Sequence, residues 1–147
     1  MLQTQIIGIV GGLGPYAHID FEQKLLESAR TMLGAQADQD YPEWVLSSIP
    51  RTPDRTRAIV GTDTDPLPWL LRSIRRLERG NDQDTPGADF VAIPCNTAHL
   101  FLPALREQVS IPILDMIRAT ARAVTRAHPL ARVGILATNG TLASRSS

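Results

Sequence analysis

Residues 5–15, QIIGIVGGLGP, decide how this chain folds. A short β-branched run ends in three glycines, which predicts a buried parallel strand that feeds a tight turn. Pro15 suits the first turn of a helix. The predicted helix covers residues 16–33 and ends at Gly34, because apolar residues recur there at helical spacing and should face a core: Ile19, Leu25, Leu26, Ala29, Met32 and Leu33.

The same alternation of strand and helix patterns continues along the chain. Further strands are expected at residues 44–49 (WVLSSI), 88–94 (ADFVAIP), 111–114 (IPIL) and 132–137 (RVGILA). Asp65 and Pro66 can begin a helix, and residues 116–127 form another helix pattern. The apolar stripe of the first of these helices consists of Leu67, Leu70, Leu71, Ile74 and Leu77. Such alternation predicts an α/β fold with a parallel sheet covered on both faces by helices.

Composition restricts the function classes. The chain of 147 residues is 43% hydrophobic, which is enough for one globular core, and its 15 basic residues balance 15 acidic ones. No net charge draws it to nucleic acid or to an anionic membrane, and no apolar run approaches the roughly 20 residues of a membrane span. One cysteine cannot form an internal disulfide, and no leader pattern opens the sequence, so a cytoplasmic location is expected.

Two polar stretches are expected to be exposed. The basic residues Arg72, Arg75, Arg76 and Arg79 favour a solvated helix face over an anion site, because the chain as a whole is neutral. Residues 80–87 (GNDQDTPG) have the composition of a surface loop.

Motif-like loops follow four of the expected strands, at residues 11–15, 53–56, 95–97 and 138–141. Ligands of parallel α/β sheets bind at the carboxyl ends of the strands. The sequence therefore predicts an active site where these loops meet.

Among the residues of these loops, Cys95 is the best suited to act as an acid, a base or a nucleophile. It lies between a strand and the expected start of a helix, whose free N–H groups would favour a thiolate. The alternative is a small buried apolar residue. Asn96 and Thr97 add donors suited to a carboxylate or a developing oxyanion. His99 permits a Cys/His pair, but packing is favoured, since no group that would orient the imidazole is identifiable.

The glycine turn and Arg55 are candidate anion contacts. Residues 11–17 match a dinucleotide fingerprint only superficially, because the acidic residue expected after the second strand is absent. We interpret Gly12 instead as letting the backbone approach a small anion. Arg55 can clamp a substrate carboxylate or pair with Asp54, and composition does not decide between them. One cysteine and three scattered histidines show no metal-ligand spacing.

Taken together, these loops resemble the aspartate/glutamate racemase family. The resembling segments occur in the family's order: residues 11–15 (GGLGP), 53–56 (PDRT), 95–99 (CNTAH) and 133–141 (VGILATNGT). The resemblance implies a two-domain α/β isomerase that interconverts L- and D-aspartate or glutamate without a cofactor. Residues 1–116 would be the first domain, and residues 117–147 a linking helix and the first strand of a truncated second domain.

The resemblance also implies residue roles. Cys95 would be one of two cysteine acid/base groups on opposite faces of the substrate. Asn96, Thr97 and Thr141 would bind the region of the α-carboxylate, and Arg55 the side-chain carboxylate.

The sequence departs from the family in one respect. The second cysteine belongs to a later glycine-cysteine-threonine-like loop that these 147 residues do not contain. One base exchanges a proton on one face only, so we expect the chain alone to racemise poorly. We also expect it to associate with a second copy or a complementary fragment. The alternatives are a one-cysteine decarboxylase or isomerase of related fold, and a non-catalytic carboxylate-binding or interaction module.

Overall fold

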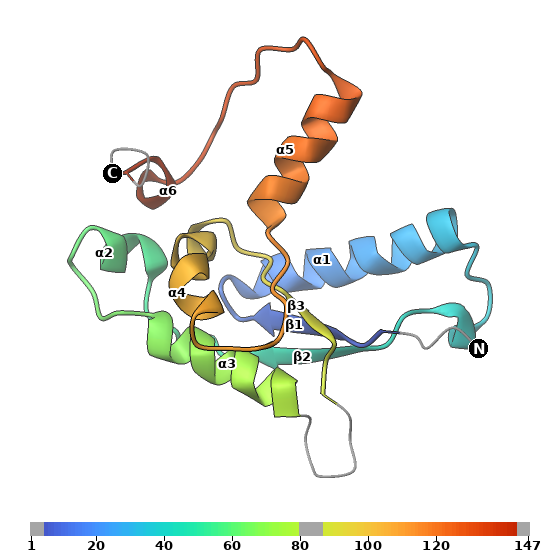
Figure 1. The fold of residues 1–147 in the computed structure, drawn as a ribbon, viewed down its shortest axis with the longest axis horizontal. Coiled ribbons are helices and arrows are strands. Elements are labelled where there is room, and N and C mark those ends of the chain that lie inside the picture. Colours follow the sequence, from blue (N-terminus) through green and yellow to red (C-terminus); the bar gives the residue numbers. More distant parts are fainter. Residues whose placement is uncertain (1–4, 80–86, 144–147) are drawn as a thin grey trace.

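The computed structural model describes residues 5–79 and 87–143. A parallel three-stranded sheet, ordered β2-β1-β3, is flanked by helices (Figure 1). The strands are β1 (Ile7–Gly11), β2 (Trp44–Ser48) and β3 (Phe90–Ala92). Ile7 pairs with Trp44 on one side and with Phe90 on the other. The predicted α/β fold with a parallel sheet is confirmed.

Strand β1 occupies the centre of the sheet, and all five of its residues are buried. This burial explains its nearly continuous apolar sequence, because a central parallel strand is covered on both faces. The chain passes from β1 to β2 on one side and returns to β3 on the other. A reversal of strand order opens a crevice at the carboxyl ends of the two strands, here β1 and β3, and ligands of open α/β sheets bind in such crevices.

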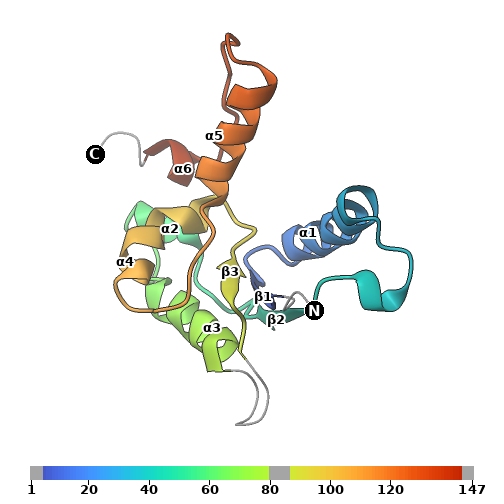
Figure 2. The same cartoon turned by 45° about the vertical axis from the view of Figure 1, so that its right-hand side comes forward.

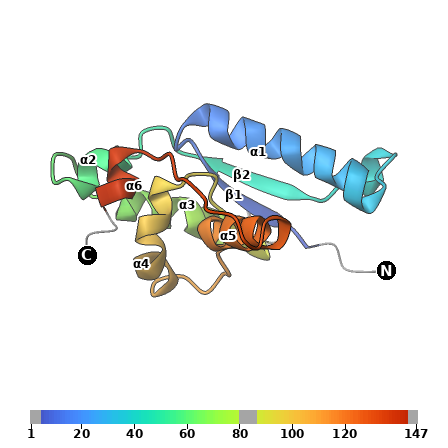
Figure 3. The same cartoon turned by 90° about the horizontal axis from the view of Figure 1, so that it is seen from above.

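Helices cover the two faces unequally. Helix α1 (Pro15–Ser28) packs on one face, and α3 (Leu67–Arg79) with α4 (Leu102–Arg106) on the other (Figure 3). The main core lies on the α3 side. The predicted stripe of α3 is confirmed, with Leu70, Leu71, Ile74 and Leu77 buried. The side chains of Arg72, Arg75 and Arg76 are exposed, as expected of a solvated face; that of Arg79 lies outside the described side chains.

The predicted burial of the α1 stripe is largely wrong. Ala29 is buried and Leu25 half-buried, but Ile19, Leu26, Met32 and Leu33 are exposed, the last two by 80% and 72%. Residues Ala29–Leu33 form a π-helical turn, η1, before Gly34 ends the segment with φ 74°. Met32 and Leu33 lie within this wider turn, which points them away from the face set by α1. Ile19 and Leu26 precede the turn, so their exposure follows from the lack of cover on that side of α1.

Short helical segments connect the remaining elements. Segment η2 (Asp38–Asp40) precedes β2, and α2 (Arg55–Ile59) follows it. The Oδ1 of Asp54 caps α2 by accepting the N–H of Arg57 at 2.8 Å, so the predicted loop at residues 53–56 ends in a helical turn. Segment η3 (Thr97–Phe101) leads into α4, whose first turn contains Pro103. Proline fits the first turn of a helix but not its interior, so Pro103 lies where one helical segment gives way to the next.

The predicted fourth strand at residues 111–114 is reduced to a single bridge between Val91 and Ile113. The N–H of Val91 donates to the Pro112 carbonyl, and the N–H of Leu114 to the Val91 carbonyl, both at 2.8 Å. Pro112 has no N–H and limits the ladder. The expected position was right, and the expected length was too great.

The predicted fifth strand at residues 132–137 is wrong. Helix α5 (Met116–Ala127) is followed by an irregular segment and then by α6 (Asn139–Ala143). Leu136 is fully exposed. No described strand pairs with this segment, and extended backbone without a partner gains no ladder hydrogen bonds. A sequence with strand propensity is therefore not enough for residues 132–137 to form a strand.

We call residues 5–115 the body and residues 116–143 the arm. Figure 2 shows α5 projecting from the body, while α6 returns beside α2. No helix in the described parts of the chain is long and apolar enough to cross a membrane. Likewise, residues 5–79 and 87–143 contain no group of three histidine, cysteine or acidic residues placed to hold a metal ion.

Candidate active site

The glycine turn after β1 packs tightly against the end of β2. A Cβ at Gly12, where φ is 81°, would lie 2.7 Å from the backbone of Ile49, so only glycine fits. The N–H of Gly12 donates to Nδ1 of His18 at 3.3 Å. The group that lies close to Gly12 is therefore the backbone of Ile49 and not a ligand. The Gly12 N–H already donates to His18, so it is not available to an anion.

Arg55 joins the β2 loop to this turn. Its Nη2 donates to the carbonyl of Leu13 at 3.0 Å, and its Nη1 to the carbonyls of Pro53 at 3.1 Å and Thr52 at 3.4 Å. It does not pair with Asp54, whose carboxylate caps α2 instead. Its Nε is buried without a partner, and no ion pair involves Arg55 within the described residues. The half-buried guanidinium thus keeps an uncompensated charge and an unused donor, which suit a carboxylate.

Cys95 follows β3 at the same edge of the sheet. The thiol is free, half-buried, and packed against the rim of the main core. The side chain is thus not sealed in the interior. The helix expected to begin here is present only as the five-residue 3-10 segment η3, which gives way to α4 with Pro103 in its first turn. A helix macrodipole of ordinary length is therefore not present beside the sulfur.

His99 makes backbone hydrogen bonds with both ring nitrogens. Nδ1 lies 2.9 Å from the Cys95 carbonyl, and Nε2 accepts the N–H of Met116 at 3.1 Å. Nδ1 must then carry the proton and donate to that carbonyl. The imidazole holds the Cys95 backbone against the start of α5, so the packing interpretation is supported over a nucleophilic Cys/His pair.

A cluster of threonine hydroxyls attaches the arm to the body. Thr97 Oγ1 lies 3.2 Å from Thr138 Oγ1 and 3.4 Å from Thr141 Oγ1. A Cβ at Gly140 would lie 2.9 Å from the Cα of Thr56, so α6 also sits directly against α2. Three of the four predicted loops therefore meet here. Asn96 is exposed and makes no side-chain capping bond.

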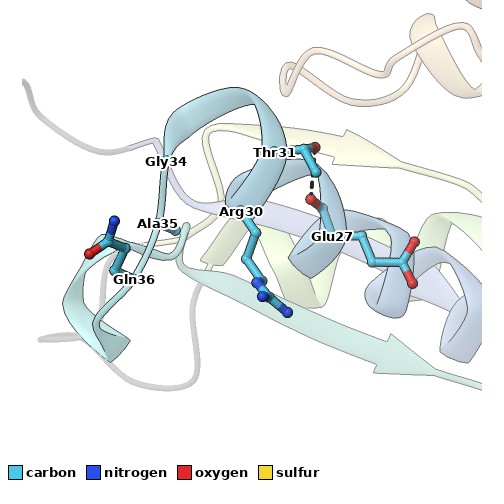
Figure 4. A pocket seen from close by; sticks show the side chains of 6 residues that line it. All are labelled: Glu27, Arg30, Thr31, Gly34, Ala35 and Gln36. Atoms are coloured by element: carbon cyan, nitrogen blue, oxygen red, sulfur yellow. Dashed lines mark hydrogen bonds between the residues drawn. The ribbon is translucent and has the colours of Figure 1, made fainter.

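A separate open hollow of about 510 Å³ lies elsewhere (Figure 4). It is lined by Glu27, Arg30, Thr31, Gly34, Ala35 and Gln36. Helix α1 starts at the carboxyl edge of the sheet and runs back along it, so this hollow lies at the opposite edge from Cys95. Its position argues against a part in chemistry at the strand carboxyl ends.

Sequence reasoning missed two contacts that organise the site. In the sequence His18 is one of three scattered histidines, and its place in the helix that follows a glycine turn is the signal that could have identified it. The Leu13 carbonyl that holds Arg55 left no trace in the sequence, because a backbone acceptor has no side-chain signature.

Comparisons with known proteins agree with this arrangement. Residues 10–146 match the family model described as Asp/Glu/Hydantoin racemase. The chain is 30% identical over 140 residues to the broad specificity amino-acid racemase RacX of Bacillus subtilis (strain 168), covering 95% of this chain and 57% of RacX. It is also 44% identical over 57 residues to a glutamate racemase of Lactiplantibacillus plantarum, covering 38% of this chain and 21% of that protein.

A solved structure gives the same result. The aspartate racemase of Picrophilus torridus superposes with a TM-score of 0.79 at 32% identity, covering 95% of this chain and 55% of that one. The chain thus spans little more than half the length of RacX and of this structure. The family resemblance inferred from the motifs is confirmed.

Proposed function

Because this chain belongs to the Asp/Glu/hydantoin racemase family, we propose that it forms part of a racemase that interconverts L- and D-aspartate or glutamate without a cofactor. The observation that carries the proposal is the position of Cys95, a half-buried residue with a free thiol, just after the carboxyl end of β3. That end lies beside the glycine turn of β1, where open α/β sheets bind their ligands. The printed names of RacX and the Picrophilus torridus protein support an amino-acid substrate.

In this proposal Arg55 binds the side-chain carboxylate. Its unpartnered Nε and its uncompensated charge support that role. The α-carboxylate is bound by donors around η3, namely Asn96, Thr97 and Thr141. Gly12 shapes the turn beside them, since its own N–H is bound to His18.

The chemistry is a two-base proton transfer. The Cys95 thiolate removes the α-proton, leaving the electron pair on Cα, and a second acid returns a proton to the opposite face. The 147 residues hold one cysteine, so a single copy supplies one thiol and the second acid comes from a second copy or a complementary fragment. We propose that residues 1–116 form the first domain and that residues 117–147 are a linking helix and the beginning of a second domain, whose first-strand sequence at residues 132–137 has no partner strand among the described residues. Association with a second copy or a complementary fragment would supply the missing face.

The test is deuterium exchange at the α-carbon of L- and D-aspartate in D₂O. We expect the chain to exchange one enantiomer, because it presents one base to one face, and Cys95→Ser to abolish that exchange. Ser28→Ala, an exposed change at the far end of α1, is the control. Exchange that persists in Cys95→Ser would remove the thiol from the mechanism. CO₂ release from a malonate-like acid would favour the one-cysteine decarboxylase instead.

The role of Arg55 is tested by a matched pair of substitutions. Arg55→Lys keeps the charge but removes the planar fork, so we expect weaker binding of L-aspartate. Arg57→Lys alters an exposed arginine of the same helix and should change nothing. Equal effects of the two substitutions would argue against a specific clamp.

A further inference from the structure

His18 occupies the first turn of α1, yet it is only 7% exposed. Its Nδ1 accepts the N–H of Gly12 at 3.3 Å. The ring also lies against the end of β1, because a Cβ at Gly11 would be 3.0 Å from its Cγ and Nδ1. A buried imidazole is therefore hydrogen-bonded to the glycine turn that follows the carboxyl end of β1.

Gly12 and Leu13 connect this imidazole to Arg55. Leu13 follows Gly12 directly, and its carbonyl accepts Arg55 Nη2 at 3.0 Å. The other carbonyls that hold the guanidinium, those of Thr52 and Pro53, belong to the same loop as Arg55 and move with it. Among the described residues, Leu13 is thus the hydrogen-bond acceptor that fixes Arg55 relative to β1.

The turn itself has little intrinsic rigidity. Gly12 and Gly14 have φ values of 81° and 102°, and glycine gives up more conformational freedom on folding than any other residue. A side-chain bond to the Gly12 N–H restricts this turn from outside. The Gly12 N–H and the Leu13 carbonyl belong to peptide units two apart in this turn, so restricting the Gly12 N–H narrows the directions open to the Leu13 carbonyl.

We propose that His18 is a positioning residue for Arg55: by holding the Gly12 N–H it orients the Leu13 carbonyl, which aims the guanidinium at the side-chain carboxylate of an acidic amino acid. This inference rests on the proposed function for the identity of the ligand. The geometric part, from His18 to Arg55, stands without it.

The chemistry of the bond suggests the variants. Nδ1 accepts a hydrogen bond only when the proton is on Nε2. In His18→Asn the amide Oδ1 lies near the position of Nδ1 and can accept the same N–H. His18→Leu is similar in bulk but has no acceptor. A purely structural, space-filling role would be served better by leucine, whereas positioning requires asparagine.

The binding experiment uses L-aspartate and L-asparagine with the full 147-residue chain. A hydrogen bond to a charged group supports an effect of about tenfold in affinity. We therefore expect His18→Leu to weaken L-aspartate binding about tenfold while leaving L-asparagine unchanged, since only the former has a side-chain carboxylate for Arg55. His18→Asn should recover most of the loss. Equal binding of L-aspartate by wild type and His18→Leu would overturn the proposal.

A second readout separates this inference from the proposed function. The side-chain Nε–H resonance of Arg55 in ¹⁵N NMR reports how firmly the guanidinium is held without any ligand. We expect a sharp signal in wild type and His18→Asn, and a broadened one in His18→Leu. If wild type binds no L-aspartate, the ligand assignment fails and this pattern alone decides the role of His18. An unchanged signal in a folded His18→Leu, with folding checked by circular dichroism, refutes it.

Discussion

The body and the arm contain similar apolar sequence but differ in what it packs against. In the body, β1 has a strand on each side and Ile9 is completely buried. In the arm, residues 132–137 have the same kind of pattern, yet Leu136 is fully exposed, and α5 has no buried residue. The comparison teaches that a sequence with a strand pattern forms a strand only where adjacent strands supply hydrogen bonds and packed elements bury its side chains.

The largest effect should come from the core of the body. Ile74 on α3 is 0% exposed in the main cluster, so Ile74→Ala should lower the free energy of unfolding by about 3 kcal/mol through lost burial and the cavity it leaves. Urea denaturation monitored by circular dichroism measures this. The matched control in the arm is Leu136→Ala, which should cost less than about 0.5 kcal/mol. Similar losses in both variants would break the distinction between body and arm.

A medium effect on the free energy of unfolding is expected at Glu78, the residue of α3 whose carboxylate accepts hydrogen bonds from Ser110 and Ile111. Burial raises the pKa of Glu78, but it is outweighed by the hydroxyl of Ser110, the N–H groups of Ile111 and Ser110, and the charge of Arg75. The pKa of this carboxyl therefore lies below its ordinary value. The stabilisation from Glu78 is present above the unfolded pKa of about 4.3 and is lost as the pH falls through the lower folded value.

Glu78→Gln tests this link. At neutral pH the substitution should cost about 1 kcal/mol of unfolding free energy, because the amide is a weaker acceptor for the three hydrogen bonds. The difference from wild type should close as the pH falls through the lowered folded pKa of Glu78. The exposed Glu107→Gln serves as control. A difference that is constant with pH would contradict the account.

The smallest effect on global stability is expected where the arm meets the body. Thr97→Val removes the hydroxyl that contacts Thr138 and Thr141, so α6 should separate from η3. Because the arm buries little surface, the unfolding free energy should change by less than about 0.5 kcal/mol. Trypsin should nevertheless cleave faster at Arg132. Thr125→Val, an exposed change on α5, is the control, and equal cleavage in the two variants would show that the hydroxyl cluster does not hold the arm.

The sequence predicted the elements of the body well, because their signals are local. The β-branched run before the glycine turn and the stripe of α3 correspond to buried surfaces of the structure. Two failures had causes that the sequence does not show: the strand at residues 132–137 lacks a partner, and the π turn at Ala29–Leu33 redirects the residues that follow α1.

The candidate site divides in the same way. The gathering of loops at the strand carboxyl ends followed from topology, and it places Arg55 beside the glycine turn and Thr97 beside Thr141. The contact of His99 Nε2 with the Met116 N–H could not be deduced, because that group lies 17 residues away and its position depends on the finished fold. The cap that Asp54 forms with the Arg57 N–H is local, and aspartate is a common helix N-cap, so the sequence does carry a signal for it.

The central claim is that Cys95 and Arg55 serve one dicarboxylate site at the carboxyl edge of the body. Cys95 is the only cysteine, so its alkylation by iodoacetamide can be followed by intact mass without ambiguity. We predict that wild-type protein is alkylated under native conditions, that L-aspartate slows the reaction, and that this protection is lost in Arg55→Gln but kept in Arg57→Gln. A thiol that reacts only after denaturation, or at a rate that L-aspartate does not change, would contradict the claim.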